Sequence, residues 1–249
     1  DDQGIVWSNP DGYTLRPSVW TVIGEDFLDS AFVWAHRADP NAVLILNDYG
    51  VEFKGDAKAE ALYNLAQRLK DRGVPIDGVG LQCHLDVYGV DPGRLDQNIK
   101  RYNDLGLKCV ITELDLGMDA KNETNLRQQA QDYFNIAQVA LKYDHCNELM
   151  IWGLTDNRSW RSNSNPLLFD SELNEKPAYF GLHAAVRQAS GSTIGGVDGV
   201  ENTIADYGEP SAQALYSLQG VPVGKGYHGP VIEVTLFKNG QKSIKKTFK

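Results

Sequence analysis

Residues Val110–Gly117 read VITELDLG, a strand pattern of Val, Ile and Leu that two acids interrupt. Burying an unpaired carboxylate costs several kcal/mol, so a buried strand is expected to carry two of them only where they have partners or a task. Successive strand residues point to opposite faces, so Glu113 and Asp115 should point the same way. The stretch therefore predicts a strand near 108–115 with a pair of carboxylates near its carboxyl end.

Similar segments lie on both sides of this strand. Short apolar runs predict strands near 43–48, 78–84 and 148–155. Helical spacing of apolar residues predicts the intervening helices, with Asp56 and Asp91 as N-caps and Gly73 and Gly106 just past two of the ends. The expected helices cover residues 18–40, 55–73, 91–106, 125–144 and 176–188.

Strand and helix alternate with a repeat of about 30 to 40 residues, which is typical of the βα unit and implies a parallel α/β sheet. Four such units follow one helix. A doubly wound sheet can be built from four units, whereas a (β/α)8 barrel closes only with eight. Periodicity alone leaves both architectures open.

The ends of the chain differ from this pattern. Residues 1–18 have neither a helix nor a strand period, and the first domain is expected to end at residue 189. Residues 190–214 are rich in Gly, Ser and Thr and predict a linker. Residues 215–249 predict a small β domain in which Asn239-Gly240 forms a type I′ hairpin turn.

Composition excludes several function classes. A formal net charge of −9 argues against nucleic-acid binding, which needs a basic surface. No apolar run approaches the roughly 18 residues of a membrane span. The three cysteines have no metal-like spacing and predict buried or free thiols. No Gly-rich phosphate loop follows a strand, which disfavours a flavodoxin-like domain. Neither a metal nor a cofactor is expected.

All four predicted strands end in polar or aromatic residues, where parallel α/β folds bind ligands. Each residue alone has an ordinary interpretation: His84 as a core histidine, Asp115 as a loop cap, the tryptophans as packing. Trp20 and Trp34, at helical spacing, are assigned to the core. The converging set favours a site, made by Asn47, Tyr49, Gln82, His84, Glu113, Asp115, Trp152 and Asp156.

Five motifs resemble successive signatures of glycoside hydrolase family 10, the endo-β-1,4-xylanases. They are LILNDYG, GVPIDGVGLQCHL, VITELDL, IWGLTDNRSW and PLLFDSELNEKPAY, in family order between about residues 18 and 188. The resemblance implies that these strands are the fifth to eighth of a (β/α)8 TIM barrel, so residues 1–189 would be the C-terminal half of a catalytic domain.

The resemblance also implies roles. Glu113 would be the catalytic nucleophile, His84 would hydrogen-bond its carboxylate, and Asp115 would hold His84. Gln82 would lie beside the sugar next to the cleaved bond, and Trp152 and Trp160 would wall the sugar sites. Asn47 and Tyr49 would shape the cleft, either by touching substrate or by hydrogen-bonding residues that do. The implied partners are xylan or xylo-oligosaccharides.

A retaining glycosidase needs a second carboxylate as acid/base. The family pattern places it at the end of the fourth strand, so it is expected upstream of residue 1, together with the N-terminal half of the barrel. Asp1 and Asp2, in a loop at the chain start, are rejected as substitutes. The 249-residue chain alone is therefore expected to be inactive.

Two other functions stay open: a non-catalytic xylan-binding half-barrel, and a flavodoxin-like binding domain that the lack of a phosphate loop disfavours. The tail resembles the sorting domains that end many secreted proteins of Bacteroidetes-type bacteria, with a generic β appendage as the alternative. A bacterial enzyme that is secreted, surface-bound or periplasmic is expected.

Overall fold

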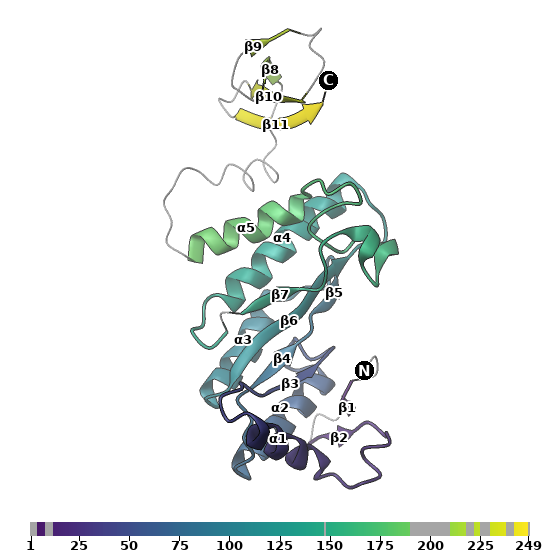
Figure 1. The fold of residues 1–249 in the computed structure, drawn as a ribbon, viewed down its shortest axis with the longest axis vertical. Helices are drawn as coiled ribbons and strands as arrows, with labels where there is room; N and C mark the ends of the chain where they lie inside the picture. Colours follow the sequence, from purple (N-terminus) through teal and green to yellow (C-terminus); the bar gives the residue numbers. More distant parts are fainter. Residues whose placement is uncertain are drawn as a thin grey trace. The chain divides into compact units, whose positions relative to one another are not determined.

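The computed structural model describes residues 4–7, 12–146, 148–189, 210–217, 222–224, 230–237 and 242–248. The chain divides into two compact units, Asp1–Ser192 and Thr193–Lys249 (Figure 1). No helix within these described ranges is both long and apolar enough to cross a membrane.

The first unit alternates strands and helices as predicted. Its strands are β1 (Val6–Trp7), β2 (Thr14–Leu15), β3 (Ile45–Asp48), β4 (Gly78–Leu81), β5 (His84–Asp86), β6 (Lys108–Gly117) and β7 (Leu149–Ile151). Its helices are α1 (Phe27–Ala38), α2 (Ala57–Asp71), α3 (Pro92–Asp104), α4 (Glu123–Ala140) and α5 (Pro177–Ala189), with short 3-10 turns at Asp156–Arg158 and Ser162–Ser164.

The five-stranded sheet of the first unit is parallel throughout. Strand β3 pairs with β4, β4 with β6, and β6 with β7, while β5 continues the line of β4 along the carboxyl-terminal half of β6. Helices α2, α3 and α4 lie alongside these strands (Figure 1). One apolar core joins buried residues of the strands and helices, such as Leu62, Ile99, Ile111 and Ile136.

Strand β6 contains one residue more than its neighbours at the point where the acids lie. Leu81 pairs with Ile111 and His84 pairs with Asp115, so two residues on one side oppose three on the other. The register to β7 shifts over the same interval, between Ile111 and Leu114. Such a bulge bends a strand and re-aims side chains, and here it surrounds Glu113. The alternation of residues could not reveal it.

Helix ends follow the predicted chemistry with one exception. Asp91 accepts a hydrogen bond from the Arg94 N–H (3.0 Å) with Pro92 as the first helical residue. Gly106 takes the left-handed φ of +71° that closes this helix. Asp56 occupies the N-cap position of α2, but its side chain makes no capping bond and pairs with Arg94 instead.

Residues 1–18 contain structure that the sequence pattern did not predict. β1 and β2 form an antiparallel ribbon, with Val6 opposite Leu15. The buried carboxylate of Asp48, at the end of β3, accepts from the N–H groups of Ile5 (2.8 Å) and Val6 (3.1 Å) and pairs with Lys58 (3.0 Å). A long-range side-chain contact therefore holds the ribbon, and local periodicity does not encode it.

Other sequence expectations are corrected. Trp20 and Trp34 do not belong to the core, because they are 60% and 66% exposed. The predicted helix over 18–40 begins only at Phe27, since residues 18–23 form turns. The strand predicted near 148–155 is limited to β7, after which Thr155 makes an isolated bridge with Phe169.

The second unit is an antiparallel sheet in the order β11-β10-β8-β9. Its strands are β8 (Pro210–Ser217), β9 (Pro222–Val223), β10 (Pro230–Phe237) and β11 (Lys242–Phe248). β8 begins inside the stretch assigned to the linker over 190–214; residues 190–209 of that stretch lie outside the described residues. β10 and β11 pair as a hairpin would, and the Asn239-Gly240 turn also lies outside the described residues.

Candidate active site

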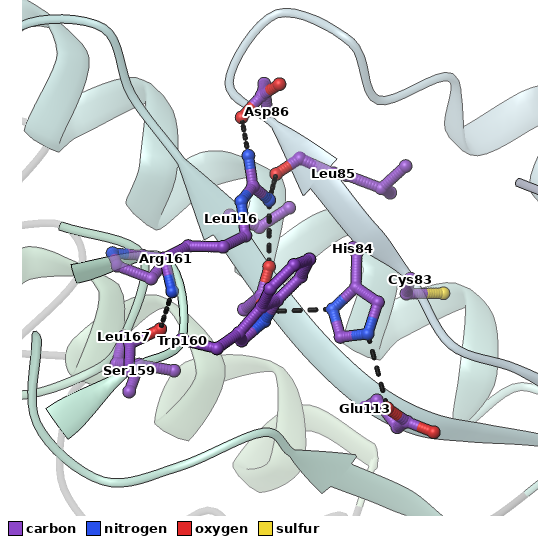
Figure 2. Close-up of polar contacts among 12 residues, drawn as sticks. Cys83, His84, Leu85, Asp86, Glu113, Leu116, Ser159, Trp160, Arg161 and Leu167 are labelled. Carbon is purple, nitrogen blue, oxygen red and sulfur yellow. Dashed lines mark hydrogen bonds and ion pairs between the residues drawn. The ribbon is translucent and has the colours of Figure 1, made fainter. Parts of the chain in front are cut away.

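The two acids of the opening stretch and His84 form one connected group, of which Figure 2 labels His84 and Glu113. The His84 Nδ1 lies 3.0 Å from Asp115 Oδ2, and Nε2 lies 3.2 Å from Glu113 Oε2. The pairing of β5 with β6 sets His84 directly opposite Asp115, while the bulge in β6 surrounds Glu113. The imidazole thus links two carboxylates of one strand, which confirms the predicted cluster.

Both nitrogens of His84 face oxygens that can only accept hydrogen bonds when ionised. Two N–H donors are needed to satisfy both contacts, so the geometry fits a protonated imidazolium. Burial lowers the pKa of His84, but the hydrogen bond and charge of Asp115 and the charge of Glu113 outweigh it, and the net pKa is raised above its usual value. The surroundings of His84 therefore favour its protonated form.

Asn47 aims the other oxygen of Glu113. Its Nδ2 donates to Glu113 Oε1 (2.9 Å), and its own Oδ1 accepts from the hydroxyl of Thr112 (2.7 Å). Gly80 on β4 leaves the space that this amide occupies, because a Cβ there would collide with Asn47 Oδ1. Asn47 therefore hydrogen-bonds the expected nucleophile, which is one of the two roles left open for it.

Asp115 is fully buried, and two side chains besides His84 donate hydrogen bonds to its carboxylate. Trp160 Nε1 donates to its Oδ2 (2.8 Å), beside the His84 contact, and Arg161 Nη1 donates to Oδ1 (2.9 Å). Arg161 also donates to the Leu85 carbonyl (2.9 Å) and pairs with Asp86 (Figure 2).

Sequence reasoning named Trp160 only as a sugar wall and did not name Arg161. The available signal was a cation directly after a tryptophan, in a loop following a strand end. That signal is weak, because a surface arginine in a loop is common and its partner here is distant in sequence.

A second buried carboxylate, Glu52, supports the turn that leads into His84. Its Oε1 accepts from the Cys83 N–H (2.9 Å), and Cys83 has a left-handed φ of 60°. Burial raises the pKa of Glu52, and backbone N–H groups including that of Cys83 only partly offset it. Glu52 thus stabilises a strained residue directly before the histidine.

The remaining predicted site residues lie around this group. Trp152 follows β7, and its ring centroid is 6.4 Å from that of His84; the Trp160 ring is 4.9 Å away, edge-on. Both tryptophans remain about half or more exposed, so ring surface is open to a ligand.

Gln82 lies between β4 and β5, and its backbone N–H donates to the Asp48 carbonyl oxygen. The Tyr49 ring lies 3.7 Å from the Lys58 ammonium.

Asp156, also expected at the strand ends, has a structural role instead. It is buried against Lys176 (3.0 Å) and accepts from the Leu167 N–H (2.9 Å), which ties the loop after β7 to the start of α5.

The three cysteines are buried free thiols. Within the described ranges, no group of three or more His, Cys, Asp and Glu side chains could hold a metal ion.

Comparison with known proteins gives a consistent result. Residues 6–185 match the model for glycosyl hydrolase family 10. The chain is 36% identical over 186 residues to endo-1,4-beta-xylanase B of Thermotoga neapolitana, which covers 72% of the chain and 54% of the relative. The chain therefore spans about half the length of this relative.

Solved structures agree with the sequence comparison. Native xylanase 10B from Thermotoga maritima superposes with a TM-score of 0.69 at 34% identity, covering 75% of this chain and 60% of that one. Xylanase 10B from Thermotoga petrophila in complex with xylobiose gives the same TM-score and identity, covering 74% and 57%. The expected α/β fold, with the parallel sheet of a partial barrel, is confirmed.

Proposed function

The chain belongs to glycosyl hydrolase family 10, and from that membership we propose that it supplies the nucleophile half of a retaining endo-1,4-β-xylanase. The observation that carries the proposal is the Glu113 carboxylate, which is held on one oxygen by Asn47 and on the other by His84. A carboxylate fixed at both oxygens but still partly accessible suits attack on an anomeric carbon.

Asp115 cannot serve as the second carboxylate of such a mechanism. Its side chain is fully buried and is held by His84, Trp160 and Arg161, so it has no path to a leaving-group oxygen. A retaining glycosidase places its acid/base roughly 5–5.5 Å from the nucleophile. We assign that role to a carboxylate of an upstream half-barrel, as the family pattern implies.

Surface features of the first unit support a missing partner of that kind. Among the described residues, edge strands β3 and β7 each pair with a single neighbour, although parallel sheets are normally covered and continued. An apolar group is also exposed near the start of the unit: Val19, Trp20, Val22, Ile23 and Trp34. Completing the barrel would cover such surface.

Xylan is the proposed substrate. Two exposed tryptophans beside His84 offer apolar ring faces of the kind that pack on sugars, and one structural relative is a complex with xylobiose. A xylan-binding half-barrel without catalysis would use the same rings. It would have no use for the hydrogen bonds that aim Glu113, which favours the enzyme.

The stereochemistry of the product tests this proposal. In an enzyme reassembled with the upstream half-barrel, double displacement through Glu113 should release the β-anomer first, which then mutarotates. Proton NMR of the anomeric signals in the first minutes of xylo-oligosaccharide hydrolysis measures this. Initial release of the α-anomer would mean single displacement and would rule out Glu113 as nucleophile.

We further propose that the protein is bacterial and acts at the cell surface, in the periplasm or after secretion, because a polymeric substrate does not cross membranes. The second unit would be a sorting-type β domain, and its antiparallel sheet is compatible with that assignment. A generic β appendage is the alternative. Loss of surface retention or secretion on removal of residues 193–249 distinguishes the two.

A further inference from the structure

Arg161 joins two charged groups beside the candidate nucleophile. Its Nη1 lies 2.9 Å from Asp115 Oδ1, and its Nη2 pairs with Asp86 at the end of β5. The Leu85 carbonyl accepts from the same Nη1 at 2.9 Å, and the Ser159 hydroxyl accepts from the Arg161 backbone N–H at 3.0 Å. These contacts hold both terminal nitrogens of the guanidinium and the Arg161 backbone, in the position that Figure 2 shows.

The chain also leaves room for this contact. Gly117, the last residue of β6, lies against the guanidinium, and a Cβ there would come within 2.7 Å of Arg161 Nη2. The Arg161 side chain is only 18% exposed. An arginine this well enclosed, with its charge directed at a fully buried carboxylate, is more than a surface ion pair.

We propose that Arg161 is a positioning residue, which fixes the Asp115 carboxylate and partly neutralises the negative charge that acts on His84. Asp115 offers one oxygen to Arg161 and the other to His84 and Trp160. With the arginine in place, the histidine faces a carboxylate whose charge is partly neutralised. Without it, the same histidine would face an uncompensated buried anion.

The sign of the effect follows from the charges around the imidazole. From β6, Asp115 and Glu113 stabilise the protonated form. Arg161 carries the same charge as the imidazolium and so opposes it, and Asp86 on β5 weakens that opposition by pairing with the guanidinium. Removing the positive charge should therefore raise the pKa of His84 further. A nearby charge typically moves a pKa by about 1–3 units, and the indirect position of Arg161 favours the lower end, about 1 unit.

This proposal depends on the proposed function only for its catalytic consequence. A more strongly held imidazolium stabilises the Glu113 anion more. Attack on the sugar then becomes harder, because that negative charge is lost when the glycosyl ester forms. The titration of His84 itself needs no substrate. Failure of the xylanase proposal would therefore leave the test below intact, and the reverse also holds.

The test is an NMR titration of the His84 Cε1–H signal in the full 249-residue chain, assigned by its loss in His84→Gln. Arg161→Met and Arg161→Gln remove the charge and should raise the midpoint by about 1 pH unit. Arg161→Lys keeps a charge and should leave the midpoint near that of the parent. The glutamine and lysine variants retain a hydrogen-bond donor, so they keep the test valid if the methionine variant does not fold.

The matched control is Arg101→Met. Arg101 is also buried, and it pairs with Glu60 and donates to Asn98, but it does not contact the His84 group. Its loss should lower stability without moving the His84 midpoint. An unchanged midpoint in the neutral Arg161 variants would overturn the proposal. An equal shift in Arg161→Lys or in Arg101→Met would also overturn it, because the effect would then come from structure and not from charge.

Discussion

Glu113→Gln, in the enzyme reassembled with its upstream half-barrel, is expected to lower kcat on xylan by roughly four to six orders of magnitude, as removal of a nucleophile does in other enzymes. The amide keeps the shape of the side chain and can still contact Asn47 and His84. It cannot form the ester with the sugar. Binding of xylo-oligosaccharides should survive, so kcat should fall far more than the apparent affinity.

Steady-state kinetics on xylan, with calorimetry of xylo-oligosaccharide binding, measures both quantities. Glu123→Gln is the matched control, because Glu123 is an exposed acid at the start of α4 whose ion pair among the described residues is with Arg127 of its own helix. A loss of less than tenfold in Glu113→Gln would show that another group attacks the sugar.

The chain without a partner half is expected to hydrolyse xylan negligibly. Protonation of the leaving group by a placed acid contributes about 10²–10⁴-fold, and the described residues offer only the enclosed Asp115 beside Glu113. The sugar-binding residues expected from the other half of the barrel would be missing as well. Mixing or co-expressing the chain with the upstream half should restore turnover.

Release of reducing ends from xylan, by the chain alone and by the mixture, checks this prediction. A preparation of Glu113→Gln mixed with the same upstream half controls for contaminating xylanase. Activity of the isolated chain within tenfold of the mixture would place the acid/base inside residues 1–249 and would contradict the division of roles proposed here.

The strands and helices that sequence predicted well are those that local patterns determine. β4 and β6 are short apolar runs, and α3 carries its own start and stop signals in Asp91, Pro92 and Gly106. Because parallel strands end at the same edge, the positions of His84 and Glu113 in their strands predicted one shared site, and the resemblance to family 10 implied their contact.

The parts that sequence missed depend on contacts between distant residues. The bulge in β6 is visible only in the register against β4, β5 and β7. Arg161 lies 46 residues after Asp115 and becomes part of the site only once the loop after β7 folds back. Trp20 and Trp34 have the spacing of core residues, yet the described part of the chain does not cover them.

The central claim is that Glu113 forms a covalent bond with the sugar. The direct measurement is mass spectrometry of peptides from the reassembled enzyme after reaction with a 2-deoxy-2-fluoro xylobioside that carries a good leaving group, which slows release of the glycosyl-enzyme. One added fluoroxylobiosyl group is expected, on the carboxylate of Glu113 in the peptide that contains VITELDLG. A label on any other residue, or continued turnover with no label, would contradict it.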